Sequence, residues 1–405
     1  MTTATQKIPS GYKQTEIGVI PVDWDVKGLG SICKYQNGTS LERYFNQHDG
    51  YKVISIGNYS TSGNYIDTGS YISFDLRDRV NKFILNKDDL TMILNDKTST
   101  GEIIGRVLLI EKSNCYVFNQ RTMRLTPDSD VLPKYLYFLI NSNAVHKKLA
   151  RQAKPGTQIY FNTSDILDFK ISFPKDKTEQ STIIDTLADA DILIKKLEKL
   201  IEKKKNIKQG LMQELLTGKR RLHSFNGDWT EKNISDLCGK ITTGKLNANA
   251  MVEDGEYRFY TCAKDFYQID HYAFNTEALL VSGNGANVGY IHYYKGKFNA
   301  YQRTYVLSDF SADIHFIKLF MDRNLQERIR VEVNAGNTPY ITMGTLADMQ
   351  IMIPPTKEEQ TAIANVLSDI DTEIEKLESQ LTKYQNIKQG MMQTLLTGKI
   401  RLLTK

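Results

Sequence analysis

The chain of 405 residues is 40% hydrophobic and carries a formal net charge of +5, so two to four folded domains are expected and a peptide hormone or disulfide-stabilised mini-protein is excluded. The charge is too weak to identify a nucleic-acid partner by itself. Scattered cysteines without a CxxC pair, and no apolar run that could form a signal peptide or cross a membrane, predict a cytoplasmic protein with free thiols, no metal site and no membrane contact.

The chain is expected to begin with an N-terminal extension at 1–17, followed by a strand-rich first module at 18–175. Short β-branched and aromatic runs, broken by Gly and Asn, predict its strands at 51–56, 91–94 and 107–110. One amphipathic helix is expected at 132–149.

A long helix is predicted next, within a spacer segment at 176–218. Pro174 ends a strand-like run, Thr178 offers an N-cap oxygen and Gly218 supplies a C-terminal stop. Apolar residues then recur at alternating steps of 4 and 3, which is typical of a coiled-coil seam: Ile183, Leu187, Ala190, Ile194, Leu197 and Ile201. Beyond this point the apolar positions shift to Ile207, Leu211 and Leu215, which predicts a stutter.

The second module is expected at 219–354 and again reads as strand-rich. Its strands are predicted at 257–262, 278–281 and 290–294, and its helix at 312–331. The segment 239–246 nearly matches a phosphate-binding P-loop, but Leu246 stands where the motif needs Ser or Thr. The glycine-rich segment 282–289 precedes a strand-like run and is therefore interpreted as a hairpin turn, with a partner turn at 100–105 in the first module.

A second spacer helix is predicted at 355–400. Pro354, Thr356 and Gly398 take the places of Pro174, Thr178 and Gly218. Its seam follows the same alternation of steps: Ile363, Leu367, Ile370, Ile374, Leu377 and Leu381.

These correspondences arise from an internal repeat. When the chain is shifted by 180 residues, 19 of the 29 positions in 194–222 are identical to those in 374–402. Weaker echoes join the modules, such as Asn119-Gln120-Arg121-Thr122 and Tyr301-Gln302-Arg303-Thr304. We therefore expect an α+β fold with a pseudo-two-fold internal repeat, in which two strand-rich α/β modules are separated by two long antiparallel coiled-coil helices.

The sequence holds few signs of catalysis. The six His lack metal-site spacing, and no serine-hydrolase elbow or amino-methyltransferase motif occurs. Basic residues do cluster, because 194–222 holds ten Lys or Arg against three Glu. This cluster is compatible with phosphate binding and also with the solvated exterior of a coiled coil.

The duplicated motifs resemble the DNA-specificity subunit of type I restriction-modification systems. The resemblance rests on the segment 11–24, on the Pro-x-x-x-x-x-Gln helix starts at 174–180 and 354–360, and on the repeated Ile-Lys-Gln-Gly-x-Met-Gln-x-Leu-Leu-Thr-Gly-Lys. It spans essentially the whole chain. It implies two target recognition domains, each reading one half of a bipartite double-stranded DNA site, and helices that dock two methyltransferase subunits, with restriction and translocase subunits joining later.

The same resemblance implies a chain that is not itself an enzyme and has no cofactor of its own. S-adenosylmethionine, ATP and Mg²⁺ are then expected in the partner subunits. Two other hypotheses stay open from the sequence: a coiled-coil adaptor without DNA specificity, and a nuclease or methyltransferase with unrecognised motifs.

Polar turn residues are the candidates for DNA contact, since their side chains can bond base edges or phosphates: Asn58, Tyr59, Asn64, Lys97, Gln120, Arg121, Asn284, Asn287, Gln302 and Arg303. A motif kept in both modules could instead support the fold, which is the competing interpretation for Gln120, Arg121, Gln302 and Arg303. Seam and repeat positions are the candidates for helix pairing and partner docking: Ile194, Leu197, Ile201, Leu211, Leu215, Ile374, Leu377, Leu381, Met391 and Leu395. Residues shared by both helices, such as Lys208 and Lys388 or Gln213 and Gln393, should serve the same two roles.

Overall fold

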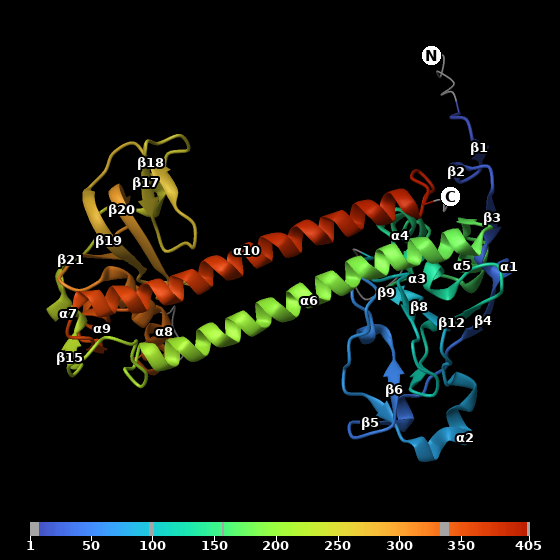
Figure 1. Ribbon diagram of the computed structural model, residues 1–405, viewed down its shortest axis with the longest axis horizontal. Coiled ribbons are helices and arrows are strands. Elements are labelled where there is room, and N and C mark those ends of the chain that lie inside the picture. The colour runs from blue at the N-terminus through green and yellow to red at the C-terminus, as the bar shows by residue number, and fades with distance from the viewer. Residues whose placement is uncertain (1–7, 97–100, 156–157, 333–339, 403–405) are drawn as a thin grey trace. The chain divides into compact units, whose positions relative to one another are not determined.

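The computed structural model describes residues 8–96, 101–155, 158–332 and 340–402. It contains two compact units, one formed by 1–198 with 380–405 and the other by 199–379. Two helices of 39 residues each, α6 (Lys177–Leu215) and α10 (Lys357–Leu395), contribute residues to both units (Figure 1). Each unit thus combines one module with one part of each long helix, and the α+β class with two long helices is confirmed.

In the first unit, the start and end of the module pair as antiparallel strands, β3 (Trp24–Gly28) with β14 (Lys170–Pro174). One sheet has the order β10-β8-β12-β4 and another the order β11-β6-β7-β5. The strands of these sheets are β4 (Cys33–Asn37), β5 (Phe45–Asn46), β6 (Tyr51–Ile54), β7 (Tyr71–Ile72), β8 (Leu90–Ile93), β10 (Val107–Leu109), β11 (Tyr116–Phe118) and β12 (Thr122–Pro127).

Smaller elements complete the first unit. The segment expected to be an N-terminal extension contributes β1 (Tyr12–Thr15), which forms a hairpin with β2 (Gly18–Pro21). The remaining elements are β9 (Asn95–Asp96), β13 (Ile159–Tyr160), α1 (Leu29–Ile32), α2 (Arg77–Val80), α3 (Pro133–Asn141), α4 (Asn143–Ala150) and α5 (Thr163–Leu167).

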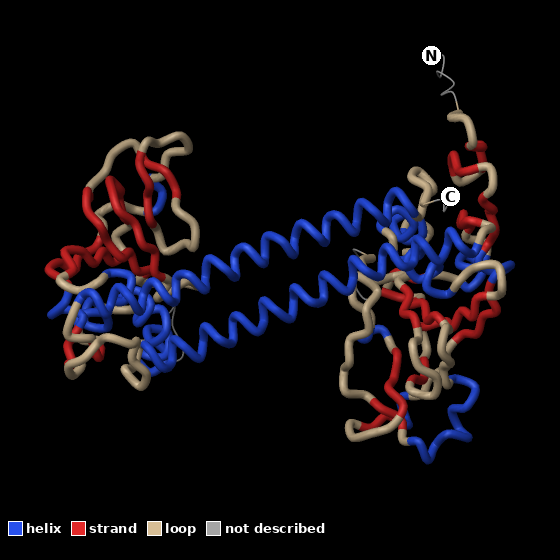
Figure 2. The backbone as a smooth tube through the Cα atoms, viewed as in Figure 1, coloured by secondary structure: helices blue, strands red, loops and turns tan. Residues whose placement is uncertain are grey.

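The second unit is closed in the same way, by β15 (Thr230–Asn233) paired with β22 (Gln350–Ile353). Its main sheet has the order β16-β21-β19-β20-β17-β18. Figure 2 separates its strands from its helices by colour. The elements are β16 (Cys238–Thr243), β17 (Tyr257–Tyr260), β18 (Tyr267–Ile269), β19 (Phe274–Ser282), β20 (Ile291–Ala300), β21 (Thr304–Phe310), α7 (Ile234–Leu237), α8 (Ile314–Glu332) and α9 (Met343–Ala347).

The six predicted strands and the predicted helix at 312–331 are confirmed, as is the hairpin turn, which joins the antiparallel β19 and β20. The single helix expected at 132–149 is wrong. It is divided into α3 and α4 at Ser142, whose backbone is extended. The Ser142 hydroxyl accepts a hydrogen bond from the Val145 amide and so caps α4, which is the role of serine at a helix start.

The N-cap residue of α6 differs from the predicted one, whereas that of α10 agrees with the prediction. Asp176, not Thr178, caps α6, because its carboxylate accepts the Thr178 amide at 2.8 Å. Thr356 caps α10 as predicted, accepting the Glu359 amide at 3.3 Å. Gly218 and Gly398 follow the helices with φ of +69° and +70°, the left-handed conformation in which glycine is favoured, so both C-terminal stops are confirmed.

The predicted stutter is wrong. Ile207 is 42% exposed, and the steps of 4 and 3 continue through Lys204 and Lys208 to Leu211. The Lys208 ammonium pairs with Asp371 at 2.6 Å, and in the other unit Lys388 pairs with Asp191 at 2.5 Å. Lysine can occupy a seam because its methylenes pack while its charge reaches a partner. In the second unit Lys204 pairs with Glu373 at 2.7 Å, and four residues further on Lys208 pairs with Asp371, so the two helix segments pack antiparallel there.

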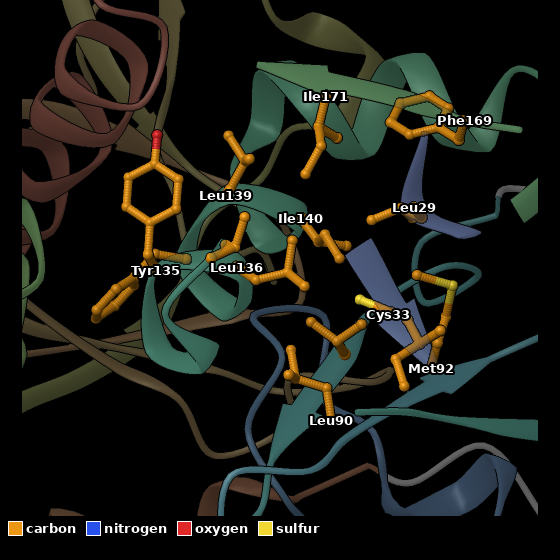
Figure 3. Close-up of a cluster of buried hydrophobic side chains, with 14 of the residues drawn as sticks. Leu29, Cys33, Leu90, Met92, Tyr135, Leu136, Leu139, Ile140, Phe169 and Ile171 are labelled. Carbon is orange, nitrogen blue, oxygen red and sulfur yellow. The ribbon is translucent and has the colours of Figure 1, made fainter. Parts of the chain in front are cut away.

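The helix ends also complete the cores of the modules. In the first unit, Leu187 and Leu395 belong to a buried cluster, part of which Figure 3 shows, including Leu136 of α3 and Met92 of β8. In the second unit, Leu215 and Leu367 join the equivalent core. The residues predicted for helix pairing are therefore buried or half-buried, with Leu211, Leu215, Met391 and Leu395 directed to module cores.

Among the described residues, no helix combines the length and apolar character of a membrane span.

The repeated Pro-x-x-x-x-x-Gln motif has a structural role in both units. The buried Gln180 side chain donates to the carbonyl of Pro174 at 2.8 Å and accepts the Leu132 amide at 2.8 Å. Gln360 likewise donates to the Pro354 carbonyl at 3.0 Å and accepts the Asp313 amide at 2.8 Å. Each glutamine thus fixes the end of a strand and the start of a module helix to one long helix.

Candidate functional site

The turn at 119–122, between β11 and β12, is held by its two end residues. Asn119 is 3% exposed, and its amide group accepts the Leu41 backbone N–H at 2.9 Å. The Thr122 hydroxyl donates to the Asn119 carbonyl at 2.5 Å. The ends of the repeated motif therefore support the fold, as the competing interpretation of this motif requires.

The two middle residues of this turn lie toward solvent. Arg121 adopts a left-handed φ of +64°, and its guanidinium donates to Gln158 at 3.0 Å. Gln120 donates to the Glu42 carboxylate at 2.6 Å. Burial alone would raise the pKa of Glu42, but hydrogen bonds from Ser40 and from the amides of Asn119 and Gln120 lower it to about 2, so the carboxylate is ionised and holds Gln120 in place.

The second module repeats this turn between β20 and β21. Thr304 is buried, whereas Gln302 and Arg303 are exposed at the tip. The carbonyl of Arg303 accepts the Gly283 amide at 2.8 Å. A Cβ atom at Gly244 would lie 1.8 Å from the Ala300 carbonyl oxygen, and one at Gly38 would lie 1.9 Å from that of Asn119. Both modules therefore need glycine where another segment passes close to this turn.

Three loops of the second module meet beside this turn, which brings the four predicted residues of this module together. The Asn287 side chain donates to the carbonyl of Cys262 at 3.0 Å, and the Cys262 thiol donates to the carbonyl of Arg303 at 3.4 Å. Asn284 follows Gly283, which bonds Arg303. The Asn287 side chain thus uses one of its donors for a hydrogen bond within the protein, whereas the Gln302 and Arg303 side chains remain exposed.

Sequence reasoning missed Arg258 in the same region. Its guanidinium carbon lies 4.3 Å from the ring centre of Phe266 and 4.6 Å from that of Tyr294. The residue alternates with buried Phe259 on β17 and is exposed. A strand pattern could have placed it outward, but the two rings come from other elements.

The first module contradicts two of the predicted DNA contacts. Asn58 is fully buried, and its side chain bonds Ser55, the Ile66 carbonyl and Thr68 within its own loop. Tyr59 is 4% exposed. Neither side chain is available to DNA, because Asn58 is bonded within its own loop and Tyr59 lies in a buried cluster with Leu85 and Phe118. Asn64 is exposed as expected, and Lys97 lies outside the described residues.

A basic groove of about 630 Å³ adjoins these loops in the first unit and was also missed. Lys147 and Arg151 lie on one side of it, one helical turn apart, and buried Arg106 lines it. Burial lowers the pKa of Arg106 to about 10, so this guanidinium stays charged near neutral pH. The groove therefore presents positive charge that could attract phosphate.

His146 lies beside Arg106, and its Nε2 forms a hydrogen bond of 2.8 Å with the Ile104 carbonyl. Burial, and then the charge of Arg106, lower its pKa to about 4. In the second module Gln326 donates to the Val288 carbonyl at 3.0 Å, at the position that is equivalent through the repeat. The ring of His146 is therefore neutral and structural.

We expect a pH-dependent loss of stability from His146. Because the folded-state pKa of about 4 lies below the ordinary 6.5, the native state binds fewer protons, so stability is full above pH 6.5 and falls as the pH drops toward 4, by up to about 3 kcal/mol. His146→Gln, which copies Gln326, should retain the bond and remove this loss. Urea unfolding of both proteins at pH 7.5, 6 and 5 measures the difference; parallel pH profiles would contradict the assignment.

Comparisons with known proteins agree with the internal repeat. The family model described as the type I restriction modification DNA specificity domain matches residues 21–209 and 226–384. The EcoDI type I restriction enzyme specificity subunit of Escherichia coli is 36% identical over 170 residues, which are 42% of this chain and 37% of that subunit. The putative MjaX specificity subunit of Methanocaldococcus jannaschii is 26% identical in an alignment of 420 positions that covers 97% of this chain and 97% of that subunit.

A solved structure shares the fold. The crystal structure of the type I restriction-modification S subunit from M. genitalium aligns with a TM-score of 0.62 and 16% identity, covering 97% of this chain and 99% of that one. This chain therefore spans little more than a third of the first relative but nearly the full length of the second and of the solved chain.

Proposed function

Since the chain belongs to the family of type I restriction-modification DNA specificity proteins, whose members are non-catalytic subunits, we propose that each of its modules reads one half of an asymmetric bipartite DNA site. The observation that carries this proposal is the turn shared by both modules. In both modules the turn ends on a buried threonine, Thr122 or Thr304, and its two middle residues lie toward solvent. The tips differ, because Arg121 adopts a left-handed φ of +64° and Arg303 does not. A common scaffold with different surroundings suits two readers of different sequences.

The exposed positions of the repeated helices support a second part of the proposal, the docking of two methyltransferase subunits. Ile207 and Ile387 are 42% and 43% exposed and are equivalent through the repeat. Gln213 and Gln393 are exposed at equivalent positions as well. Two equivalent surfaces fit two copies of one partner, and restriction and translocase subunits would join that assembly.

In this proposal S-adenosylmethionine, ATP and Mg²⁺ act in the partner subunits. The chain supplies site selection and a platform for assembly. Phosphate contacts are assigned to the basic groove of Lys147 and Arg151, because phosphates position a protein on DNA without conveying sequence.

Exchanging one module tests the proposal. The full chain would be co-expressed with its methyltransferase subunit, and the methylated sites would be read by methylome sequencing. Replacing residues 18–175 by the corresponding module of a relative should change one half of the methylated site and leave the other half and the spacer unchanged, because each module is proposed to read alone.

The reciprocal exchange of 219–354 is the matched control and should change only the other half. A change in both halves after a single exchange would refute separate reading. Binding of an interrupted duplex that falls steeply with salt would distinguish DNA recognition from a coiled-coil adaptor, because neutralised phosphates release counterions.

A further inference from the structure

Arg258 is held in one orientation before any ligand arrives. Phe266 covers it at 4.3 Å and Tyr294 at 4.6 Å from the guanidinium carbon to the ring centres, and one N–H group donates to the Tyr260 hydroxyl at 3.4 Å. No ion pair found among the described residues includes this arginine. An exposed cation thus lies against two aromatic rings, with no carboxylate partner among the described residues.

The interior of the second unit supports this arrangement through Tyr260 and Tyr294. Tyr260 is 1% exposed, and its ring centre lies 6.2 Å from that of Phe266 and 5.7 Å from that of Tyr294. Tyr260 also belongs to a buried cluster with Phe298 and Val306. Tyr294 packs against this cluster, whereas Phe266 is 43% exposed. Because contacts with Tyr260 and Tyr294 already restrict Arg258, binding through it requires less further loss of side-chain freedom.

The position of Arg258 is close to the exposed turn residues of the second module. The carbonyl of Tyr260 accepts the Tyr301 amide at 2.9 Å, which joins β17 to the turn that carries Gln302 and Arg303. The loop that leads from Tyr260 to Phe266 also bonds Arg303 and Asn287 through Cys262. The arginine therefore belongs to the same loop cluster as the candidate DNA contacts.

We propose that Arg258 reads a guanine in the half-site of the second module. Two rings lie against its guanidinium and one N–H group bonds Tyr260, so the remaining N–H groups are left for a ligand. Two N–H groups of an arginine match the O6 and N7 acceptors of guanine in the major groove. The inference rests on the proposed DNA-recognition function. A phosphate also offers paired oxygens, but phosphate binding does not need a planar cation held in one orientation.

Competition binding with substituted duplexes tests this assignment. The full chain, assembled with its methyltransferase subunit, would bind the site defined by methylome sequencing, and each base pair of the second half-site would be replaced in turn. In the unaltered protein, replacing the guanine recognised by Arg258 should weaken binding by about 5- to 150-fold. In Arg258→Ala, discrimination at that one position should disappear while the other positions keep theirs.

Arg258→Lys separates base reading from phosphate contact. Lysine keeps the charge and loses the planar fork, so base discrimination should be lost while binding to unrelated duplex stays within about twofold. Lys297→Ala is the matched control, because Lys297 also lies over an aromatic ring, 4.8 Å from the centre of Tyr272, but alternates onto the opposite face of β20 from Tyr294. It should retain the full base preference.

Three results would overturn the assignment: unchanged discrimination in Arg258→Ala, full discrimination in Arg258→Lys, or an equal loss of affinity for every duplex. Far-ultraviolet circular dichroism and thermal unfolding would show that each variant is folded. Failure of the proposed function itself is distinguishable, because the unaltered complex would then show no preferred site and no methylated sequence.

Discussion

Replacing Arg401 by methionine is expected to lower the free energy of unfolding by about 3 kcal/mol, since this change leaves a buried carboxylate without its charge partner. Arg401 donates to both oxygens of Glu179, at 2.5 and 2.7 Å, and to both oxygens of Asp23, at 2.9 and 2.7 Å. The Glu179 side chain is 2% exposed and that of Arg401 is 18% exposed. In the variant, Glu179 would keep a hydrogen bond of 3.3 Å from Trp24 as its remaining partner among these residues.

Urea unfolding of the variant beside the unaltered chain measures this effect. Arg401→Met combined with Glu179→Met should recover most of the lost stability, because the double variant no longer buries an unpaired charge. Arg401→Lys should fall between, since lysine keeps the charge but cannot form paired bonds to two carboxylates. Equal stability of Arg401→Met and the unaltered chain would show that water reaches Glu179.

The same arrangement occurs in the other unit, where Arg221 donates to both oxygens of Glu359 at 2.9 and 2.5 Å. Both arginines follow the repeated Leu-Leu-Thr-Gly-Lys, and both glutamates lie in the first turn of a long helix. The repeat therefore carries the same arginine–glutamate pair twice, although neither the arginine motif nor the helix-start motif indicates this pair by itself. Sequence comparison identified the equivalent residues, but only the folded chain shows which of them meet.

Much of the fold was predictable because the long helices obey a simple apolar period. The period alone failed at Lys204 and Lys208. The apolar positions shift to Ile207 there and predicted a stutter, but the two lysines stay in the seam and bond acidic residues of the other helix. The cap at Asp176 was missed although the repeat places this residue opposite Thr356. In both cases a polar side chain replaced the expected apolar or hydroxyl residue without changing the geometry.

The candidate site was less predictable than the fold, because polar loop residues serve two physical roles that look alike in sequence. Asn58 satisfies its own loop and is buried, whereas Gln302 is exposed at the tip of a turn. The sequence did not indicate Arg258 as a candidate for DNA contact, because its aromatic partners come from a loop and from another strand. Whether such a residue can contact DNA depends on tertiary contacts, because these decide which polar groups already have hydrogen-bond partners within the protein.

Gln180→Glu is expected to be the most informative change in the repeated motif. The Gln180 amide group donates to the carbonyls of Pro174 at 2.8 Å and Asp130 at 3.0 Å, and an ionised carboxylate would turn both attractions into repulsions at a fully buried site. We expect a loss of about 3 to 5 kcal/mol at pH 7.5, as for other unpaired buried charges, and a smaller loss, about 3 kcal/mol, for Gln180→Leu.

The pH dependence identifies the cause of this loss. Burial beside carbonyl oxygens should raise the pKa of the new carboxyl above the ordinary value of about 4.3, so the folded state binds the extra proton and the variant gains stability as the pH falls through that raised pKa. Gln180→Leu should show no such gain, and Gln213→Glu, an exposed site on the same helix, should change little at any pH. Urea unfolding at pH 7.5, 6 and 5 measures all three. A constant difference in the free energy of unfolding between Gln180→Glu and Gln180→Leu over this range would mean that the new carboxylate does not face the carbonyls. The hydrogen bonds of Gln180 would then not be what holds the strand end and the module helix to α6.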